Sequence, residues 1–269
     1  MSPLNIERKP YVGATVSRKI TKGTKEWADY NVNCIVGCYN DCRYCYARVM
    51  ARRFRRCTTD SWKNMRIRED VVKSNFKKMT GRVMFPSTHD LFEFEPFKET
   101  WLKVLAKLLA SNNSVLITTK PRLPVIQEIA EKFSGHKKDI QFRFTITSKD
   151  ETVLRFWEPN APSYRERECS LRYAFMNGFK TSVSIEPFLD YDPKDLIQEI
   201  DPFVTDSIWV GRMNYIIKHG LSINEQQYYD KIRQNYLTHH LEEIFVQLKH
   251  NPKIRFKDSI KNQLKNELL

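Results

Sequence analysis

The chain has 269 residues, 41% hydrophobic and 12% aromatic, which is enough apolar material for one sizeable α/β domain. It has no run of about 18 apolar residues, so we expect no membrane span. The first ten residues, MSPLNIERKP, lack the apolar stretch of a signal peptide, so we expect a cytoplasmic protein.

The net charge is +13, and it is unevenly spread, because residues 43–82 contain thirteen Arg and Lys against Asp60, Glu69 and Asp70. A positive field of this kind attracts polyanions, and DNA or RNA is the usual partner. A solvated, Lys-rich surface is the alternative interpretation, since net charge says nothing about fold.

Six short apolar, β-branched runs alternate with stretches of helical periodicity. In the helix expected over residues 100–110, Trp101, Leu105 and Leu108 share one face. Asn177-Gly178 is a typical end for the helix expected over 163–176. In chain order, the predicted strands are 31–36, 82–86, 115–119, 141–147, 181–185 and 207–210, and further helices are expected over 47–56 and 125–133.

This alternation predicts an α/β fold with a parallel sheet and right-handed crossovers. A partial (β/α)6 TIM-like barrel fits the spacing, with a core over residues 1–215 that includes an N-terminal lead-in. Residues 216–269 are expected to form a helical, Lys-rich C-terminal extension that packs on this core.

Ligands of such sheets bind at the carboxyl ends of the strands, so the polar residues that follow each strand are site candidates. These candidates are Cys38 onward, Ser87-Thr88-His89-Asp90, Lys120, Thr147-Ser148, Glu186 and Gly211-Arg212.

Four of the six cysteines lie within twelve residues, three of them in the loop after the first predicted strand. Cys38, Cys42 and Cys45 have the spacing C-x3-C-x2-C, which lets one tight loop direct three thiolates inward. Three thiolates can hold three irons of a 4Fe–4S cluster and leave the fourth iron open to a small molecule. Structural zinc is the alternative, although zinc sites usually combine two distant cysteine pairs.

The loop GCYNDCRYCYAR, residues 37–48, resembles the signature of the radical S-adenosylmethionine superfamily, in its spore photoproduct lyase-like (DNA repair photolyase-like) branch. Residues 144–167, FTITSKDETVLRFWEPNAPSYRER, and residues 182–190, SVSIEPFLD, are also similar to that branch. The resemblance covers roughly residues 30–215 and leaves the C-terminal tail uncovered.

The resemblance implies a 4Fe–4S cluster on Cys38, Cys42 and Cys45, and reductive cleavage of S-adenosylmethionine to methionine and a 5′-deoxyadenosyl radical. That radical takes a hydrogen atom from the substrate, and a flavodoxin or ferredoxin would supply the electron. The cofactors carry this chemistry, while the protein positions them and excludes water.

The candidate S-adenosylmethionine ligands follow the strand ends. Ser87, Thr88 and Asp90 lie where the superfamily commonly contacts the methionine amino group, although these residues are also good helix caps. Lys120 and Arg167 are candidates for the cofactor carboxylate, since an Arg can bind a carboxylate through two hydrogen bonds. The remaining candidates are Thr145 and Thr147 for the ribose, Glu186 as a carboxylate that needs a partner, and Gly211 for close approach of the adenine.

One departure from the family concerns the hydrogen-atom donor. Spore photoproduct lyase uses a Cys where this chain has Ser87, and a Ser O–H bond is too strong to give up its hydrogen atom readily. We therefore do not expect repair of the spore lesion by that route. Tyr44 and Tyr46 match tyrosines of the family beside the third Cys and are candidate hydrogen-atom relays.

The other thiols have weaker assignments. Cys34 is expected to be an inert core residue, since buried Cys behaves as a small hydrophobe, with a thiol near the cluster as the alternative. Cys57 and Cys169 are further candidate hydrogen-atom donors.

The substrate is the least determined feature. Arg48, Arg52 and Arg55 have helical spacing and would form a phosphate-binding face. Aromatic residues that could stack on bases are Trp62, Phe92, Phe94 and Trp157. Three hypotheses follow: a radical enzyme of the lyase or transferase type that acts on nucleic acid, the same chemistry on a protein, peptide or small metabolite, and a non-catalytic nucleic-acid-binding protein with a structural metal.

Overall fold

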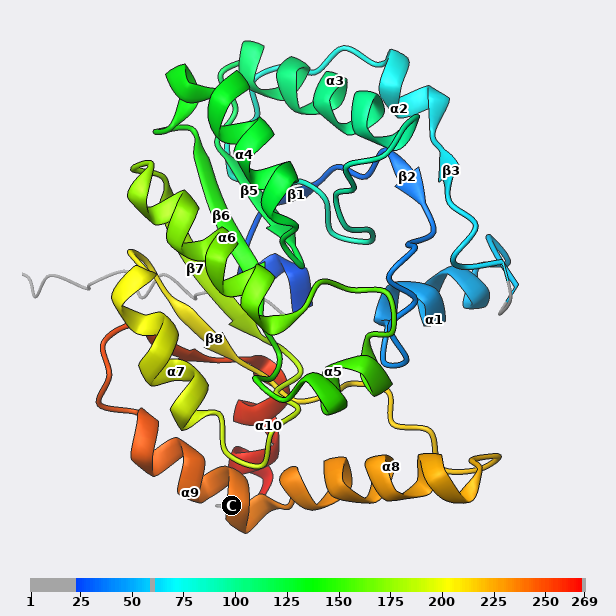
Figure 1. Ribbon diagram of the computed structural model, residues 1–269, viewed down its shortest axis with the longest axis vertical. Coiled ribbons are helices and arrows are strands. Elements are labelled where there is room, and N and C mark those ends of the chain that lie inside the picture. Colours follow the sequence, from blue (N-terminus) through cyan, green and yellow to red (C-terminus); the bar gives the residue numbers. More distant parts are fainter. Residues whose placement is uncertain (1–22, 59–60, 268–269) are drawn as a thin grey trace, which may run out of the picture.

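The computed structural model describes residues 23–58 and 61–267, so the first 22 residues of the predicted core, where its lead-in begins, and Asp60 lie outside the described residues. Seven parallel strands form one curled sheet in the order β1-β4-β5-β6-β7-β8-β9, which confirms the predicted partial barrel. Figure 1 shows the helices outside this sheet. The sheet strands are β1 (Tyr30–Asn31), β4 (Val83–Met84), β5 (Val115–Thr119), β6 (Ile140–Thr145), β7 (Lys180–Ile185), β8 (Ile208–Val210) and β9 (Ile254–Phe256).

The helices alternate with the strands as the sequence periodicity predicts. The apolar face of α3, with Trp101, Leu105 and Leu108, is fully buried against the sheet. Gly178, at φ 78°, follows the end of α6 in the left-handed conformation that glycine adopts without strain. The α-helices are α1 (Tyr46–Arg53), α2 (Glu69–Lys73), α3 (Phe97–Ala110), α4 (Leu123–Lys132), α5 (Glu151–Trp157), α6 (Tyr164–Met176), α7 (Lys194–Ile200), α8 (Ile223–Asn235), α9 (Thr238–Leu248) and α10 (Asp258–Glu267), and the 3-10 turns are η1 (Gly23–Glu26), η2 (Ser134–His136) and η3 (Asp201–Phe203).

The first predicted strand, residues 31–36, is divided in the structure. Its start is β1, which pairs with β4, whereas β2 (Ile35–Val36) pairs antiparallel with β3 (Arg66–Ile67) in a separate two-stranded sheet. The chain leaves the main sheet at Asn33, whose side chain accepts hydrogen bonds from the backbone N–H groups of Ser87 and Thr88. The cysteine loop therefore follows β2.

The helix predicted over 47–56 ends earlier, because Arg55 adopts a φ of 54°, which no α-helix continues. Arg48 and Arg52 lie on α1, but Arg48 forms an ion pair with Asp41 at 2.8 Å, so the three arginines do not form one free helical face.

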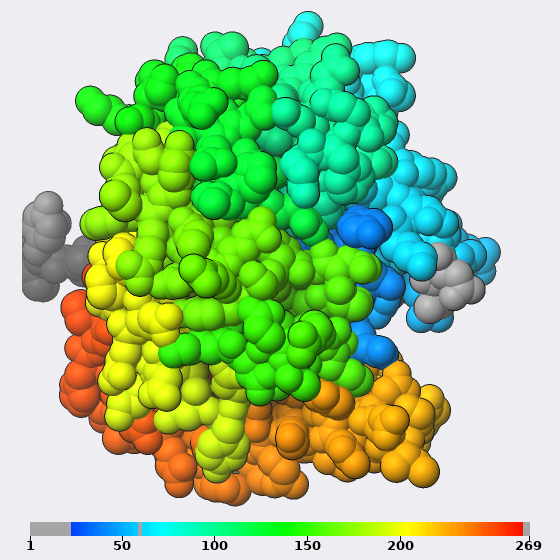
Figure 2. Space-filling model, viewed as in Figure 1, coloured from blue at the N-terminus to red at the C-terminus, as the bar shows by residue number. Residues whose placement is uncertain are grey.

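The C-terminal part is helical as predicted, with α8, α9 and α10, but it also contributes a strand that the sequence analysis missed. β9 pairs in parallel with β8 and extends the sheet by its seventh strand. Figure 2 shows the orange C-terminal helices along one end of the molecule. Among the described residues, none of the helices combines the length and apolarity that crossing a bilayer requires.

Candidate active site

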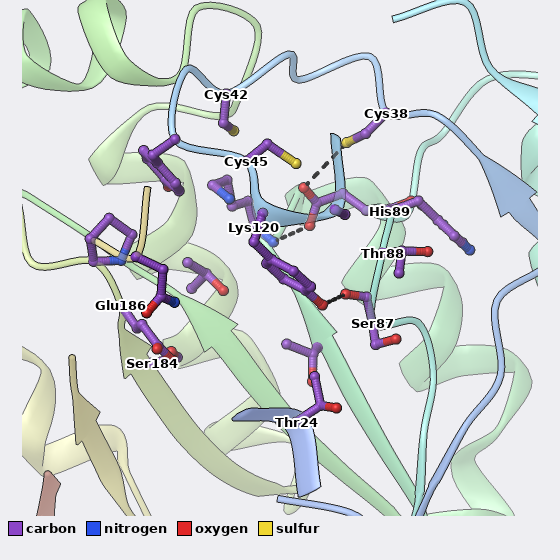
Figure 3. A pocket seen from close by; sticks show the side chains of 18 of the residues that line it. Thr24, Cys38, Cys42, Cys45, Ser87, Thr88, His89, Lys120, Ser184 and Glu186 are labelled. Carbon is purple, nitrogen blue, oxygen red and sulfur yellow. Dashed lines mark hydrogen bonds between the residues drawn. The ribbon is translucent and has the colours of Figure 1, made fainter. Parts of the chain in front are cut away.

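A cavity lies at the carboxyl ends of the barrel strands and contains most of the predicted site residues. Figure 3 shows Cys38, Cys42 and Cys45 together at one end of it, with Lys120 beneath them. The wall also contains the predicted residues Tyr44, Tyr46, Ser87, Thr88, Asp90, Thr145 and Glu186.

Backbone conformation turns the cysteine loop into this cavity. Gly37 has a φ of 94°, and a Cβ there would lie 2.6 Å from the carbonyl oxygen of Trp62, so only glycine fits. Asp41 also has a positive φ, 46°, and its N–H donates to the carbonyl of Cys38 at 3.2 Å. The N–H of Cys45 donates to the carbonyl of Cys42 at 3.1 Å, so two tight turns present the three thiols from one short segment.

Arg43 ties this loop to the rest of the molecule. Its N–H donates to the carbonyl of Trp157 at 2.8 Å, and its guanidinium donates to the carbonyl of Phe156 at 2.8 Å. The same guanidinium pairs with Glu225 of α8 at 2.7 Å. The C-terminal extension therefore contacts the cysteine loop directly.

Burial raises the pKa of all three thiols above the usual value for cysteine. Buried thiols become thiolates readily when a metal supplies the compensating positive charge. Lys120 contributes positive charge nearby: burial alone would lower its pKa, but Cys42, Tyr44, Glu158 and Asp90 raise it well above the usual value.

Asp90 lies directly beside the thiols, with its Oδ2 3.7 Å from the Sγ of Cys38. Burial would raise the pKa of Asp90, but Lys120 and hydrogen-bond donors around it lower the pKa below the usual value. These donors are the side chains of Asn40, at 2.7 Å, and Thr119, at 2.9 Å, and the N–H of Lys120, at 2.7 Å. Both carboxylate oxygens of Asp90 accept hydrogen bonds in this way, so its side chain is held in place in the part of the cavity wall that follows β4.

The donor set fits an iron–sulfur cluster. Each thiolate of such a cluster binds a different iron. The three sulfurs must therefore lie along one cavity wall, but they need not converge on a single metal position. The three cysteines line one cavity, and in residues 23–58 and 61–267 no three His, Cys, Asp or Glu side chains converge on one metal position.

Tyr44 belongs to a buried network behind the cysteine loop. Its hydroxyl donates to Glu158, which also accepts a hydrogen bond from Thr147 Oγ1 at 2.7 Å and forms an ion pair with Arg167. Both members of that ion pair have fully buried side chains. Thr147 and Arg167, two of the predicted cofactor ligands, do not line the cavity. Both instead bind Glu158, which in turn accepts the hydrogen bond from Tyr44.

The loop after β4 forms the opposite wall. Asn33 holds it through bonds to the N–H groups of Ser87 and Thr88, at 2.7 and 2.9 Å, and the hydroxyl of Tyr46 donates to the carbonyl of Ser87. His89 is buried and lines the cavity, and burial lowers its pKa to about 4, so it is neutral at pH 7.

Glu186 lies at the end of β7 near Lys257, a residue of the C-terminal extension that the sequence analysis missed. Burial raises the pKa of Glu186 to about 7, partly offset by Lys257, whose Nζ lies 3.9 Å from its carboxylate. Lys257 also pairs with Glu26 and donates to the carbonyl of Gly23 at 2.9 Å. Gly211 lies between them, because a Cβ there would be 2.8 Å from Cγ of Glu186 and 2.9 Å from Cγ of Lys257.

Gly211 itself does not line the cavity, so the structure gives it a role in side-chain packing rather than the close contact with adenine that the sequence suggested. Among the described residues, the remaining cysteines are also outside the cavity wall. Cys34 is fully buried with its sulfur 4.0 Å from Nε2 of His89, Cys57 lines a separate surface pocket, and Cys169 lies on α6.

The aromatic residues expected to stack on bases are mostly core residues. Trp62, Phe92 and Trp157 are buried, so none is an exposed stacking platform, and Trp62 alone of the three lines the cavity. Phe94 is partly exposed and contacts Tyr39.

Comparisons with known proteins give sequence relatives and similar solved structures. No protein-family model matches the chain. An uncharacterised protein of Methanocaldococcus jannaschii is 28% identical over 184 residues, which cover 65% of this chain and 67% of that protein. An uncharacterised protein of Acidianus two-tailed virus is 28% identical over 175 residues, covering 61% of this chain but only 57% of that protein.

Solved structures show the fold. Spore photoproduct lyase complexed with dinucleoside spore photoproduct is similar with a TM-score of 0.55 and 14% identity, over 90% of this chain and 79% of that chain. A mutant of that lyase with bound AdoMet and the dinucleoside gives a TM-score of 0.53 over the same shares, also at 14% identity. The chain therefore has the fold of spore photoproduct lyase.

Proposed function

We propose that this chain is a radical S-adenosylmethionine enzyme that abstracts a hydrogen atom from its substrate. The observation that carries the proposal is the position of Cys38, Cys42 and Cys45 on one wall of a cavity at the carboxyl ends of the barrel strands. The likeness to a lyase that is solved with AdoMet supports it. The sequence spacing and the cavity thus agree on one chemistry.

In this proposal Cys38, Cys42 and Cys45 hold a 4Fe–4S cluster, and S-adenosylmethionine binds beside it. When bound, these groups supply the 5′-deoxyadenosyl radical, given an electron from a flavodoxin or ferredoxin. Lys120 and Asp90 fix the charge around the thiols, while Ser87, Thr88, Thr145 and Glu186 offer polar groups to the bound cofactor and substrate.

Metal analysis and spectroscopy test this assignment. Protein purified and reconstituted without oxygen should hold four irons and four sulfides per chain, and its reduced cluster should change its paramagnetic resonance signal when S-adenosylmethionine is added. The Cys42→Ala variant should lose the signal. Stoichiometric zinc in place of iron, or a cluster whose signal ignores S-adenosylmethionine, would contradict the proposal.

For the substrate class we propose nucleic acid, because of a surface pocket beyond the end of α1. Arg52, Arg55, Arg56 and Arg66 line it together with Cys57. Within the described part of the chain, none of these four arginines forms an ion pair with a carboxylate. Four guanidinium groups that line one pocket and have no carboxylate partner among the described residues suit the phosphates of a polynucleotide.

Binding at two salt concentrations tests the substrate class. A labelled oligonucleotide should bind with a binding constant that falls steeply as the salt concentration rises. Changing all four arginines to Gln should reduce the slope of log binding constant against log salt concentration by about three to four, because that many fewer counterions are released. If binding has no salt dependence, the same radical chemistry on a protein, peptide or small metabolite becomes the better hypothesis. If the protein binds oligonucleotide but fails the cluster test, the third hypothesis, a non-catalytic binding protein, is favoured.

A further inference from the structure

The charges that line the cavity are not all neutralised. Three cations contribute to its wall: Lys120, Lys257 and Arg212. Lys120 lies among the acidic groups beside the thiols, and Lys257 pairs with Glu26. Arg212 has no carboxylate within ion-pair distance in the part of the chain that the structure describes.

The position of Arg212 is fixed by the C-terminal extension. It follows directly after Gly211 at the end of β8, and its Nε donates to the carbonyl of Ser259, in α10, at 3.2 Å. Its backbone N–H donates to Ser259 Oγ at 3.4 Å. The backbone bond fixes the position of Arg212 and the Nε bond orients its guanidinium, whose two terminal nitrogens have no protein acceptor among the described residues.

A half-buried guanidinium with a fixed orientation and no counter-ion among the described residues is well suited to bind an anion. Its two terminal nitrogens can donate in parallel to two oxygens of a phosphate or carboxylate, which is the strongest arrangement for Arg. Under the proposed function, the amino and carboxylate groups of S-adenosylmethionine bind the open iron beside the cysteines. The anion for Arg212 therefore belongs to the substrate.

The cavity and the arginine pocket are connected by one helix. The first residues of α1, Tyr46 and Ala47, line the cavity. Arg52, near the end of the same helix, lines the surface pocket that contains the four arginines. Eight residues of α-helix span about 12 Å. A chain of phosphates bound at the pocket would thus be within a few nucleotides of the cavity mouth, which favours phosphate over an isolated carboxylate.

We propose that Arg212 binds a phosphodiester group of a polynucleotide substrate and so fixes which nucleotide enters the cavity. This inference rests on the proposed function. It assigns a substrate-binding role to the segment of α10 that orients Arg212, and it makes the C-terminal extension part of the site.

The test pairs a protein variant with neutralised phosphates. A fluorescein-labelled 12-nucleotide oligothymidylate is prepared with each linkage in turn replaced by an uncharged methylphosphonate, and its affinity is measured for the full-length wild type and for Arg212→Gln. We expect one linkage at which the replacement weakens wild-type binding by roughly tenfold but does not further weaken binding by Arg212→Gln. Arg212→Lys, which keeps the charge but loses the paired donors, should show an intermediate loss.

Arg255 of the neighbouring strand β9 provides the matched control. It is exposed, its guanidinium bonds to the carbonyls of Pro252 and Ile254, and it does not line the cavity. Arg255→Gln should retain the full sensitivity to the replaced linkage. If the wild type binds but no linkage is coupled to Arg212, the inference is overturned and the proposed function stands; if the wild type does not bind oligonucleotide, both the nucleic-acid substrate and this inference are overturned.

Discussion

The buried ion pair between Glu158 and Arg167 gives the sharpest prediction of stability. Both side chains are fully buried, and Glu158 also accepts hydrogen bonds from Tyr44 and Thr147. Removing one partner leaves an uncompensated charge, which costs about 3–5 kcal/mol at such sites. Arg167→Met should therefore lower the free energy of unfolding by that amount.

The double variant separates the ion pair from ordinary packing. Glu158→Leu with Arg167→Met removes both charges, so the loss should be smaller than the sum of the two single losses by about 2 kcal/mol. Tyr44 and Thr147 would then lack an acceptor, so the double variant should still be less stable than the wild type.

Urea unfolding at pH 7, followed by circular dichroism, measures these differences. Arg165→Met is the matched control, because Arg165 lies on the same helix but is exposed, and it should change stability by less than about 0.5 kcal/mol. A loss below about 1 kcal/mol for Arg167→Met, or strictly additive single losses, would refute the reasoning.

Three further predictions concern the Glu186 side of the cavity. Gly211→Ala should destabilise the protein by about 1–3 kcal/mol in a thermal melt, because its Cβ would lie within 3.0 Å of Glu186 and Lys257; a loss no larger than that of Gly135→Ala, where nothing lies within 4 Å, would contradict this. The native pKa of Glu186, about 7, lies above its unfolded value of roughly 4.3, so the folded state favours the protonated carboxyl group. The stability that this preference contributes is fully present at low pH and is lost as pH rises to about 7. Glu186→Gln should therefore flatten the decline in stability between about pH 5 and 7, and an unchanged pH profile would count against the assignment. Lys257→Met should cost about 3–5 kcal/mol by leaving the buried Glu26 unpaired, and adding Glu26→Gln should recover part of that loss in urea unfolding.

The sequence predicted those parts of the molecule that depend on local periodicity and on a specific motif. Strands such as β5 and helices such as α3 follow from apolar patterns that one segment carries by itself. The spacing of Cys38, Cys42 and Cys45 predicted a shared wall, and the structure places all three on it. The assignment of the polar strand-end residues followed from the position of ligands in parallel sheets.

The features that the sequence did not reveal depend on contacts between distant segments. β9 has only three residues, and its pairing with β8 is not encoded in its own pattern. Lys257 looked like one of many lysines in a basic tail, yet pairing with Glu26, more than 200 residues away, places it in the cavity wall. Arg167 was expected at the cofactor because an Arg can bind a carboxylate, and Thr147 because its hydroxyl suits a ribose, whereas both bind Glu158 outside the cavity wall.

The most direct test of the account is release of 5′-deoxyadenosine. Reconstituted protein is mixed without oxygen with dithionite and S-adenosylmethionine, and 5′-deoxyadenosine and methionine are quantified by mass spectrometry. We expect equal amounts of both products from the wild type and none from Cys42→Ala. Cys57→Ser, outside the cavity, is the matched cysteine control and should retain release. A wild-type protein that holds its cluster and S-adenosylmethionine but releases no 5′-deoxyadenosine would contradict the account.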